Sequence, residues 1–176
     1  MDLLFIFLSI ILIISLILSY LDFCVNETIN QRINKMGIGY NLGNSFDCYD
    51  KNITIIKPDE QITLKGNIIP TKKLISNIKK KGFKTIRFPI TWINFIDESG
   101  KVDLNWLARV REVIDWIINY EMYCIMNVHH DGKPGNWLSK GMDSKNKYDL
   151  LWTQIANEFK DYNDYYKYRK IPYLKY

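Results

Sequence analysis

The sequence has few of the residues that build metal centres. It contains two histidines, and its three cysteines, at positions 24, 48 and 124, have none of the spacings that are typical of zinc sites. The histidines, His129 and His130, are adjacent, and adjacent side chains on a strand point to opposite faces. No HxH or HExxH motif occurs. We therefore expect no metal site.

The cysteines also leave the disulfide state open. Cys124 lies inside an apolar run, MYCIMNV, and is predicted to be a buried free thiol. A single disulfide between Cys24 and Cys48 remains an alternative, since sequence alone does not establish pairing.

Charge is absent from residues 3–21, LLFIFLSIILIISLILSYL. Such a run is typical of a cleaved secretory signal peptide or of an uncleaved membrane anchor. The length of the run and the lack of a preceding Lys or Arg favour the anchor, but the run is near the short end of the roughly 17–25 residues that span a bilayer. Both alternatives predict a secreted chain, or one held at the membrane with its domain outside. A buried core helix is disfavoured because no face is polar.

A basic stripe is also lacking, although the formal net charge is +5. The lysines are scattered except for the triplet at residues 79–81, which ends a helical pattern just before Gly82. Cations at that end of a helix offset its dipole. No basic run interleaves with aromatic residues, so we expect a solvated surface and no nucleic-acid partner.

What the sequence does contain is a regular alternation of apolar patterns. Strands are expected at the start of 36–46, at 83–90 and at 122–128, the last a continuous apolar run typical of a strand buried on both faces. Three helices are expected: one from Pro70 or Thr71 to residue 81, one that Asp103 caps, and one across residues 148–162. Residues 47–70 and 129–147 are expected to form loops. In the second helix Leu104, Leu107, Val110, Ile114 and Ile117 keep the spacing of one buried face, as do Leu151, Ile155 and Phe159 in the third.

This order predicts an α/β fold with parallel strands under a helical layer. The expected organisation is a leader at 1–21, a linker or short helix at 22–35, one α/β domain at 36–166 and an unstructured tail at 167–176.

Unusual polar residues fall where the predicted strands end. In parallel α/β folds, ligand sites lie at the carboxyl ends of the strands. The polar side chains expected at this edge are Asn41, Asn44, Arg87, His129, His130 and Asp131.

Arg87 is the sharpest of these. It alternates with Ile86 and Phe88, so it should lie on the opposite face of its strand, where a closed barrel would need a carboxylate partner for it. A solvent-facing arginine on an edge strand is the alternative. Trp92 and Trp137 follow at the same end and either stack on sugar faces or cover the core.

Four segments, in this order and at these separations, carry a resemblance: GIGYNLGNSFD, GFKTIRFPITW, VIDWIINYEMYCIMNVHHDG and WTQIANEFKDY. Together they make residues 36–162 similar to the amino-terminal half of the glycoside hydrolase family 5 cellulases, of the endo-β-1,4-glucanase type. The resemblance implies a partial (β/α)8 TIM barrel made of the first three to four β/α units, preceded by the apolar segment.

The resemblance also implies roles for individual residues. Family members cut β-1,4-glucan with retention, using two glutamates about 5–5.5 Å apart and no cofactor. Arg87 would support the nucleophile, while His129 and His130 would lie near the reacting sugar and Asn41 near the glycone side. Asn44, Trp92, Asp131 and Trp137 are the other expected substrate contacts.

The sequence departs from the family pattern after residues 149–162. No Asn-Glu-Pro motif follows. The only glutamate after the two histidines is Glu158, which falls on the third predicted helix. We therefore expect no catalytic residue here, a truncated or mis-predicted barrel with open edges and an unpaired Arg87, and no hydrolysis. The alternatives are a non-catalytic β-glucan-binding fragment that uses Trp92, Trp137 and the two histidines, or a membrane-anchored protein that is not an enzyme.

Overall fold

The computed structural model describes residues 3–25, 29–132, 141–162 and 166–168. The chain divides into two compact units, Met1–Lys35 and Met36–Tyr176. The two units are described separately.

The first unit consists of two helices, α1 (Leu3–Val25) and α2 (Ile29–Met36). Large apolar side chains are exposed along α1 from Phe7 to Leu18. Among the described residues, no helix is both long and apolar enough to cross a membrane.

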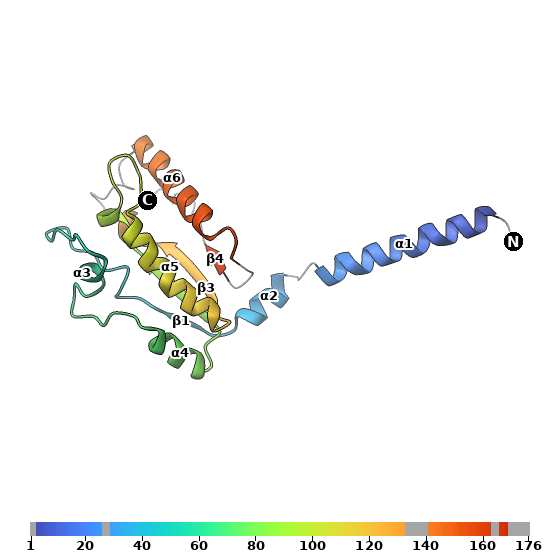
Figure 1. The fold of residues 1–176 in the computed structure, drawn as a ribbon, viewed down its shortest axis with the longest axis horizontal. Coiled ribbons are helices and arrows are strands. Elements are labelled where there is room, and N and C mark those ends of the chain that lie inside the picture. Colours follow the sequence, from blue (N-terminus) through green and yellow to red (C-terminus); the bar gives the residue numbers. More distant parts are fainter. Residues whose placement is uncertain (1–2, 26–28, 133–140, 163–165, 169–176) are drawn as a thin grey trace. The chain divides into compact units, whose positions relative to one another are not determined.

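The second unit is built on a four-stranded sheet (Figure 1). The strands lie in the order β1-β2-β3-β4, so each strand pairs with its neighbour in sequence, and every pair is parallel. This arrangement confirms the predicted parallel sheet. The strands are β1 (Gly39–Asn41), β2 (Thr85–Ile90), β3 (Tyr123–Val128) and β4 (Tyr166–Tyr168).

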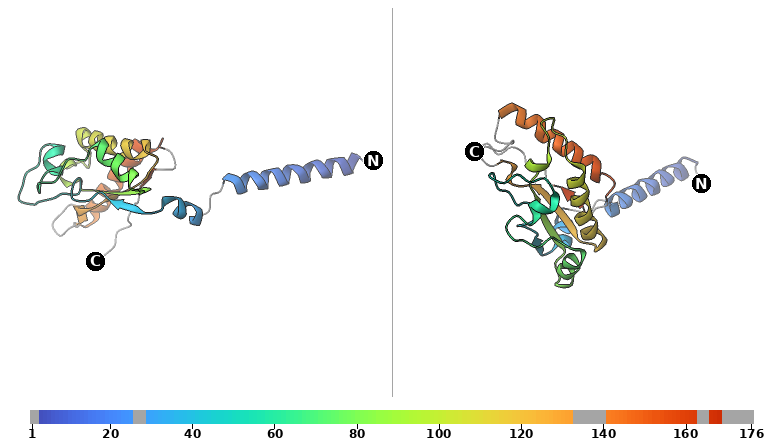
Figure 2. Two further views of the ribbon diagram at one scale, coloured as in Figure 1. Left: turned by 90° about the horizontal axis from the view of Figure 1, so that it is seen from below. Right: turned by 60° about the vertical axis from the view of Figure 1, so that its left-hand side comes forward.

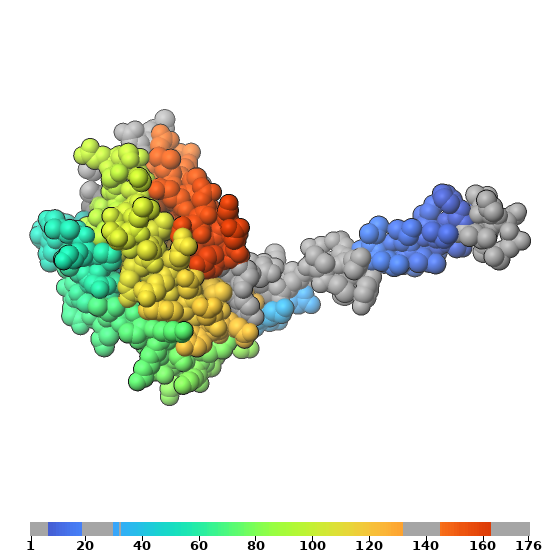
Figure 3. Space-filling model, viewed as in Figure 1, coloured from blue at the N-terminus to red at the C-terminus, as the bar shows by residue number. Residues whose placement is uncertain are grey.

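Helices connect the strands and gather on one face of the sheet, as the two further views in Figure 2 show. In the space-filling view, α5 and α6 lie against each other (Figure 3). Polar contacts join the same two helices: Arg111 pairs with Glu158, and the Tyr162 hydroxyl just after α6 donates to Asp115. The elements are α3 (Pro58–Ile62), α4 (Lys72–Lys80), η1 (Ile93–Phe95), α5 (Leu104–Asn119), η2 (His130–Gly132) and α6 (Gly141–Phe159).

Side-chain caps begin both α4 and α5, and the one at Asp103 was predicted. The Thr71 hydroxyl accepts from the Leu74 amide at 3.2 Å and begins α4, which ends just before Gly82, whose φ of +91° suits glycine. The Asp103 carboxylate accepts from the amides of Asn105 and Trp106 at 2.8 and 3.0 Å. These contacts satisfy amides that the first turn of a helix leaves unpaired.

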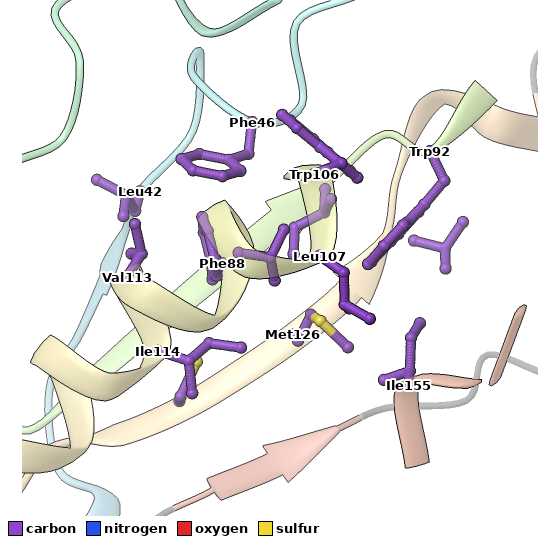
Figure 4. Packing of buried hydrophobic residues seen from close by; sticks show 14 of the residues in the cluster. Leu42, Phe46, Phe88, Trp92, Trp106, Leu107, Val113, Ile114, Met126 and Ile155 are labelled. Carbon is purple, nitrogen blue, oxygen red and sulfur yellow. The ribbon is translucent and has the colours of Figure 1, made fainter. Parts of the chain in front are cut away.

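The core lies between the sheet and the helices (Figure 4). The alternating positions Ile86, Phe88 and Ile90 of β2 are fully buried, as expected for the face opposite Arg87. The prediction for the third helix is confirmed for all three residues, and that for α5 is confirmed except at Leu104, which is 70% exposed. Leu104 is the first residue of α5, and the buried face of the helix begins at Trp106. The buried residues of α5 are Trp106, Leu107, Val110, Val113, Ile114 and Ile117.

Three elements differ from the sequence-based expectation. Helix α3 lies inside the loop predicted at 47–70, and α6 begins at Gly141, inside the loop predicted at 129–147. The unstructured tail predicted at 167–176 is wrong for residues 167 and 168, which belong to β4. A three-residue strand is too short to show a hydrophobic period, and β4 is defined by its main-chain pairing with β3.

The thiols of Cys48 and Cys124 are both free and buried. The prediction for Cys124 is therefore confirmed, and its burial raises the pKa of that thiol well above the usual range. Because Cys48 is free, the alternative of a disulfide with Cys24 is wrong.

Candidate functional site

Three predicted site residues meet at the carboxyl ends of neighbouring strands. Asn41 of β1 pairs in register with Arg87 of β2, and His129 follows β3 directly. The Arg87 Nη1 donates to Asn41 Oδ1 at 2.5 Å, and its Nη2 lies 3.5 Å from His129 Nδ1. The sheet register therefore brings side chains 42 and 46 positions apart in sequence into one polar cluster.

Arg87 lies on the predicted face of its strand, but its neighbours differ from the expectation. Its strand is interior to the sheet, between β1 and β3, so the edge-strand alternative is wrong. It is not unpaired either, because an amide oxygen and an imidazole nitrogen face its guanidinium. Within the described part of the chain no carboxylate forms an ion pair with Arg87. Its charge thus stays available to an incoming anion.

Asp47 is a member of this cluster that the sequence did not reveal. Its side chain is buried, and its Oδ2 lies 3.7 Å from His129 Nε2 while its Oδ1 accepts from the Ser45 amide at 2.9 Å. Its main chain is fixed as well, since the Thr91 hydroxyl donates to its carbonyl. His129 therefore lies between Arg87 on one ring nitrogen and Asp47 on the other. In the sequence Asp47 ends the segment GIGYNLGNSFD, six residues after β1, but no role was assigned to it.

His130 lies on the same side as His129. The two ring centroids are 4.2 Å apart, with the planes inclined by 46°. The expectation that adjacent histidines point to opposite faces is wrong here because β3 ends at Val128 and a 3-10 turn, η2, begins at His130. One donor atom from each of Asp47, His129 and His130 lies within 4.8 Å of the others. The sequence argument against a shared metal ion assumed that the two histidines point to opposite faces, and this assumption does not hold.

With this geometry in place, comparison with known proteins is informative. Residues 49–168 match the family model of the cellulases, glycosyl hydrolase family 5. The chain belongs to glycosyl hydrolase family 5. Endoglucanase A of Clostridium longisporum is 40% identical over 141 residues, which cover 77% of this chain and 27% of that protein.

Solved family 5 structures agree in fold. A GH5-4 broad specificity endoglucanase from an uncultured bovine rumen ciliate is 54% identical, with a TM-score of 0.78 over 82% of this chain and 41% of that one. A GH5-4 broad specificity endoglucanase from Ruminococcus champanellensis with bound cellotriose is 32% identical, with a TM-score of 0.75 over 81% and 42%. The chain thus spans less than half the length of these relatives, and its sheet and helices form part of a (β/α)8 barrel.

Two residues expected to contact substrate in this family 5 chain do not face solvent. Trp92 and Asp131 are both 0% exposed. The Trp92 indole belongs to the core, and its amide donates to both carboxylate oxygens of Asp131, at 3.0 and 3.1 Å. Asp131 therefore ties the turn after β3 to the loop after β2, and the prediction of a sugar contact is wrong for both residues. Trp137, predicted to stack on sugar, lies outside the described residues.

Asn41 ends β1, and Asn44 belongs to the loop that follows it. Asn44 is exposed and adopts a left-handed backbone with φ of 55°, a conformation that asparagine tolerates better than most residues. Its contact with substrate stays a prediction. Asn41 is held against Arg87 by the hydrogen bond already described.

Gly43 leaves room for the Asn41 amide. A Cβ at position 43 would lie 2.6 Å from Asn41 Nδ2. We expect Gly43→Ala to rotate the Asn41 amide away and to break its hydrogen bond to Arg87, with little loss of stability because the displaced group is a side-chain end. The side-chain NMR signals of Asn41 and Arg87 should both shift. The matched control is Gly39→Ala, whose added Cβ would meet its nearest atoms at 3.7 Å, and shifts of equal size in both variants would contradict the prediction.

Proposed function

We propose that this chain supplies substrate-positioning groups of a retaining endo-β-1,4-glucanase. The observation that carries the proposal is the cluster of Asn41, Arg87 and His129 at the carboxyl ends of three parallel strands. The family membership supports the chemistry, because the relatives named above are endoglucanases. β-1,4-Glucan is the proposed substrate.

The groups in the cluster suit this chemistry without performing its covalent step. Retaining hydrolysis uses one carboxylic acid to protonate the leaving oxygen and a second carboxylate as nucleophile. Arg87 cannot lose its proton, so it favours the ionised form of a carboxylate placed beside it. His129 has Arg87 beside Nδ1 and Asp47 beside Nε2, and these two groups fix the orientation of its ring. Asp47 is buried against His129, and this favours a role in holding the imidazole rather than in attacking a sugar.

We expect the 176-residue polypeptide to bind cello-oligosaccharides and not to cleave them. Its cluster offers a cation and imidazoles, but no Asn-Glu-Pro sequence occurs in the chain and Glu158 lies on α6, paired with Arg111. Without both carboxylates, neither leaving-group protonation nor the glycosyl-enzyme intermediate is available. The measurements are reducing-sugar release from carboxymethylcellulose and retardation in gels that contain it.

Matched variants separate the two parts of this expectation. Arg87→Ala and His129→Ala should abolish the retardation, whereas Lys80→Ala, at the far end of α4, should leave it unchanged. Release of reducing sugar by the wild-type polypeptide would contradict the proposal that the chain supplies only substrate-positioning groups. A mobility that is the same with and without the polysaccharide would contradict the proposed substrate.

A further inference from the structure

Two histidines and an aspartate converge in the cluster, although the sequence pattern predicted no metal site. We propose that Asp47, His129 and His130 bind a divalent cation that prefers imidazole nitrogen, with zinc as its representative. The donor atoms of the three residues lie within 4.8 Å of one another. Two imidazoles with one carboxylate form a ligand set that proteins use for zinc in sites with an open fourth position.

The separations are close to those that zinc requires. Ligand atoms about 2.0–2.1 Å from a tetrahedral ion lie roughly 3.3–3.4 Å apart. The His129 Nε2 and Asp47 Oδ2 are already 3.7 Å apart, and no pair of the three donor atoms is more than 4.8 Å apart, so contractions of at most about 1.5 Å by side-chain rotation would reach these separations. The arrangement is thus close to a binding geometry before any ion enters.

Main-chain contacts fix the direction of these donors. The amide of Ser45 holds Asp47 Oδ1, which turns Oδ2 toward the histidines. The amide of His130 donates to the Thr91 hydroxyl at 3.3 Å, and the His129 amide donates to the Ile90 carbonyl at 2.9 Å. Because the backbone around each ligand is anchored, binding of the ion costs little conformational entropy of the chain.

Two neighbouring groups define the site more closely. Arg87 opposes a cation by its charge, and zinc on His129 Nε2 would place the ring proton on Nδ1, facing the guanidinium 3.5 Å away. Zinc binding should therefore displace Arg87 from His129, which limits the affinity. The Cys48 thiol does not belong to the group of converging donor atoms, and its Sγ accepts from Asn67 Nδ2 at 3.3 Å instead.

A consequence for sugar binding rests on the proposed function. An ion between His129 and Asp47 would occupy the position from which His129 is proposed to meet a sugar. Zinc should therefore weaken the retention of the chain in carboxymethylcellulose gels. Failure of this competition with zinc binding intact would count against the proposed function and leave the metal site standing.

The metal site itself is tested by calorimetric titration of the full chain with zinc chloride. We expect one zinc per chain and no binding of magnesium, which prefers oxygen ligands. His130→Gln and Asp47→Asn should each weaken zinc binding about tenfold or more, by analogy with losses seen at metal sites. Asp50→Asn, three residues from Asp47, and Cys48→Ser are the matched controls and should bind zinc as the wild type does.

A second measurement does not depend on any variant folding. The chain has only two histidines, so every imidazole nitrogen signal in its NMR spectrum comes from this cluster. Stoichiometric zinc should shift the signals of both histidines. The proposal is wrong if zinc leaves them unmoved, or if folded His130→Gln binds zinc with wild-type affinity.

Discussion

Phe46→Ala is expected to lower the free energy of unfolding by about 3–5 kcal/mol, the usual cost of removing a fully buried aromatic ring. Phe46 is 0% exposed and packs edge-on against Phe88 with ring centroids 4.8 Å apart. Trp106 of α5 lies beside it (Figure 4), with ring centroids 5.1 Å apart. The Arg109 guanidinium lies 5.7 Å from the Phe46 centroid. Removing the ring would leave a cavity between β2 and α5.

The same substitution should disturb the candidate site. The Phe46 carbonyl accepts from the Thr91 amide at 3.0 Å and from Gln61 Nε2 at 2.7 Å, and the next residue is Asp47. When the loop after β1 loses its apolar anchor, Asp47 should lose its fixed position beside His129. Urea unfolding measures the first effect, and the His129 imidazole signals measure the second.

Ile56→Ala is the matched control for Phe46→Ala. Ile56 lies in the same connection between β1 and α3 but is 76% exposed, so its truncation should change stability by no more than about 0.5 kcal/mol. Equal losses in the two variants would show that Phe46 is not the anchor of this loop.

The sequence predicted well those features that repeat along the chain. The β2 alternation placed Arg87 opposite Ile86 and Phe88, and the three-and-four spacing identified most of the buried face of α5. Asp103 was recognisable as a cap because capping depends on local chemistry. The meeting of Arg87 and His129 followed from one topological rule, that parallel strands end at the same edge.

Features decided by contacts between distant segments could not be predicted in this way. Asp47 sits in a loop without period, and only the folded chain shows that it faces His129. The alternation that separates adjacent side chains stops with β3, so it did not apply to His129 and His130. The sequence left open whether Trp92 stacks on sugar or covers the core, and the structure buries it completely in the core.

Asp131→Ala is expected to destabilise the second unit by about 2–3 kcal/mol, because it leaves a buried amide without its charged acceptor. Both carboxylate oxygens lie within 3.1 Å of the Trp92 amide, and Asp131 and Trp92 are each 0% exposed. Asp131→Asn should cost less, since its amide oxygen still accepts one hydrogen bond. The measurement is the free energy of unfolding in urea, with the exposed Asp161→Ala as the control that should stay within about 0.5 kcal/mol of the wild type.

Substitution of Asp131 thus distinguishes a structural role of this residue from direct contact with substrate. If Asp131 contacted the sugar, its substitution would lower the affinity of the protein for glucan and leave the free energy of unfolding unchanged. If Asp131 instead joins the turn after β3 to the loop after β2, its substitution should lower the stability of the protein. Glucan binding should then be lost only under conditions in which the protein unfolds. Asp131→Ala with wild-type stability and lost retention in carboxymethylcellulose gels would overturn the structural assignment. The buried pairing of Asp131 with the Trp92 amide predicts the opposite order of effects.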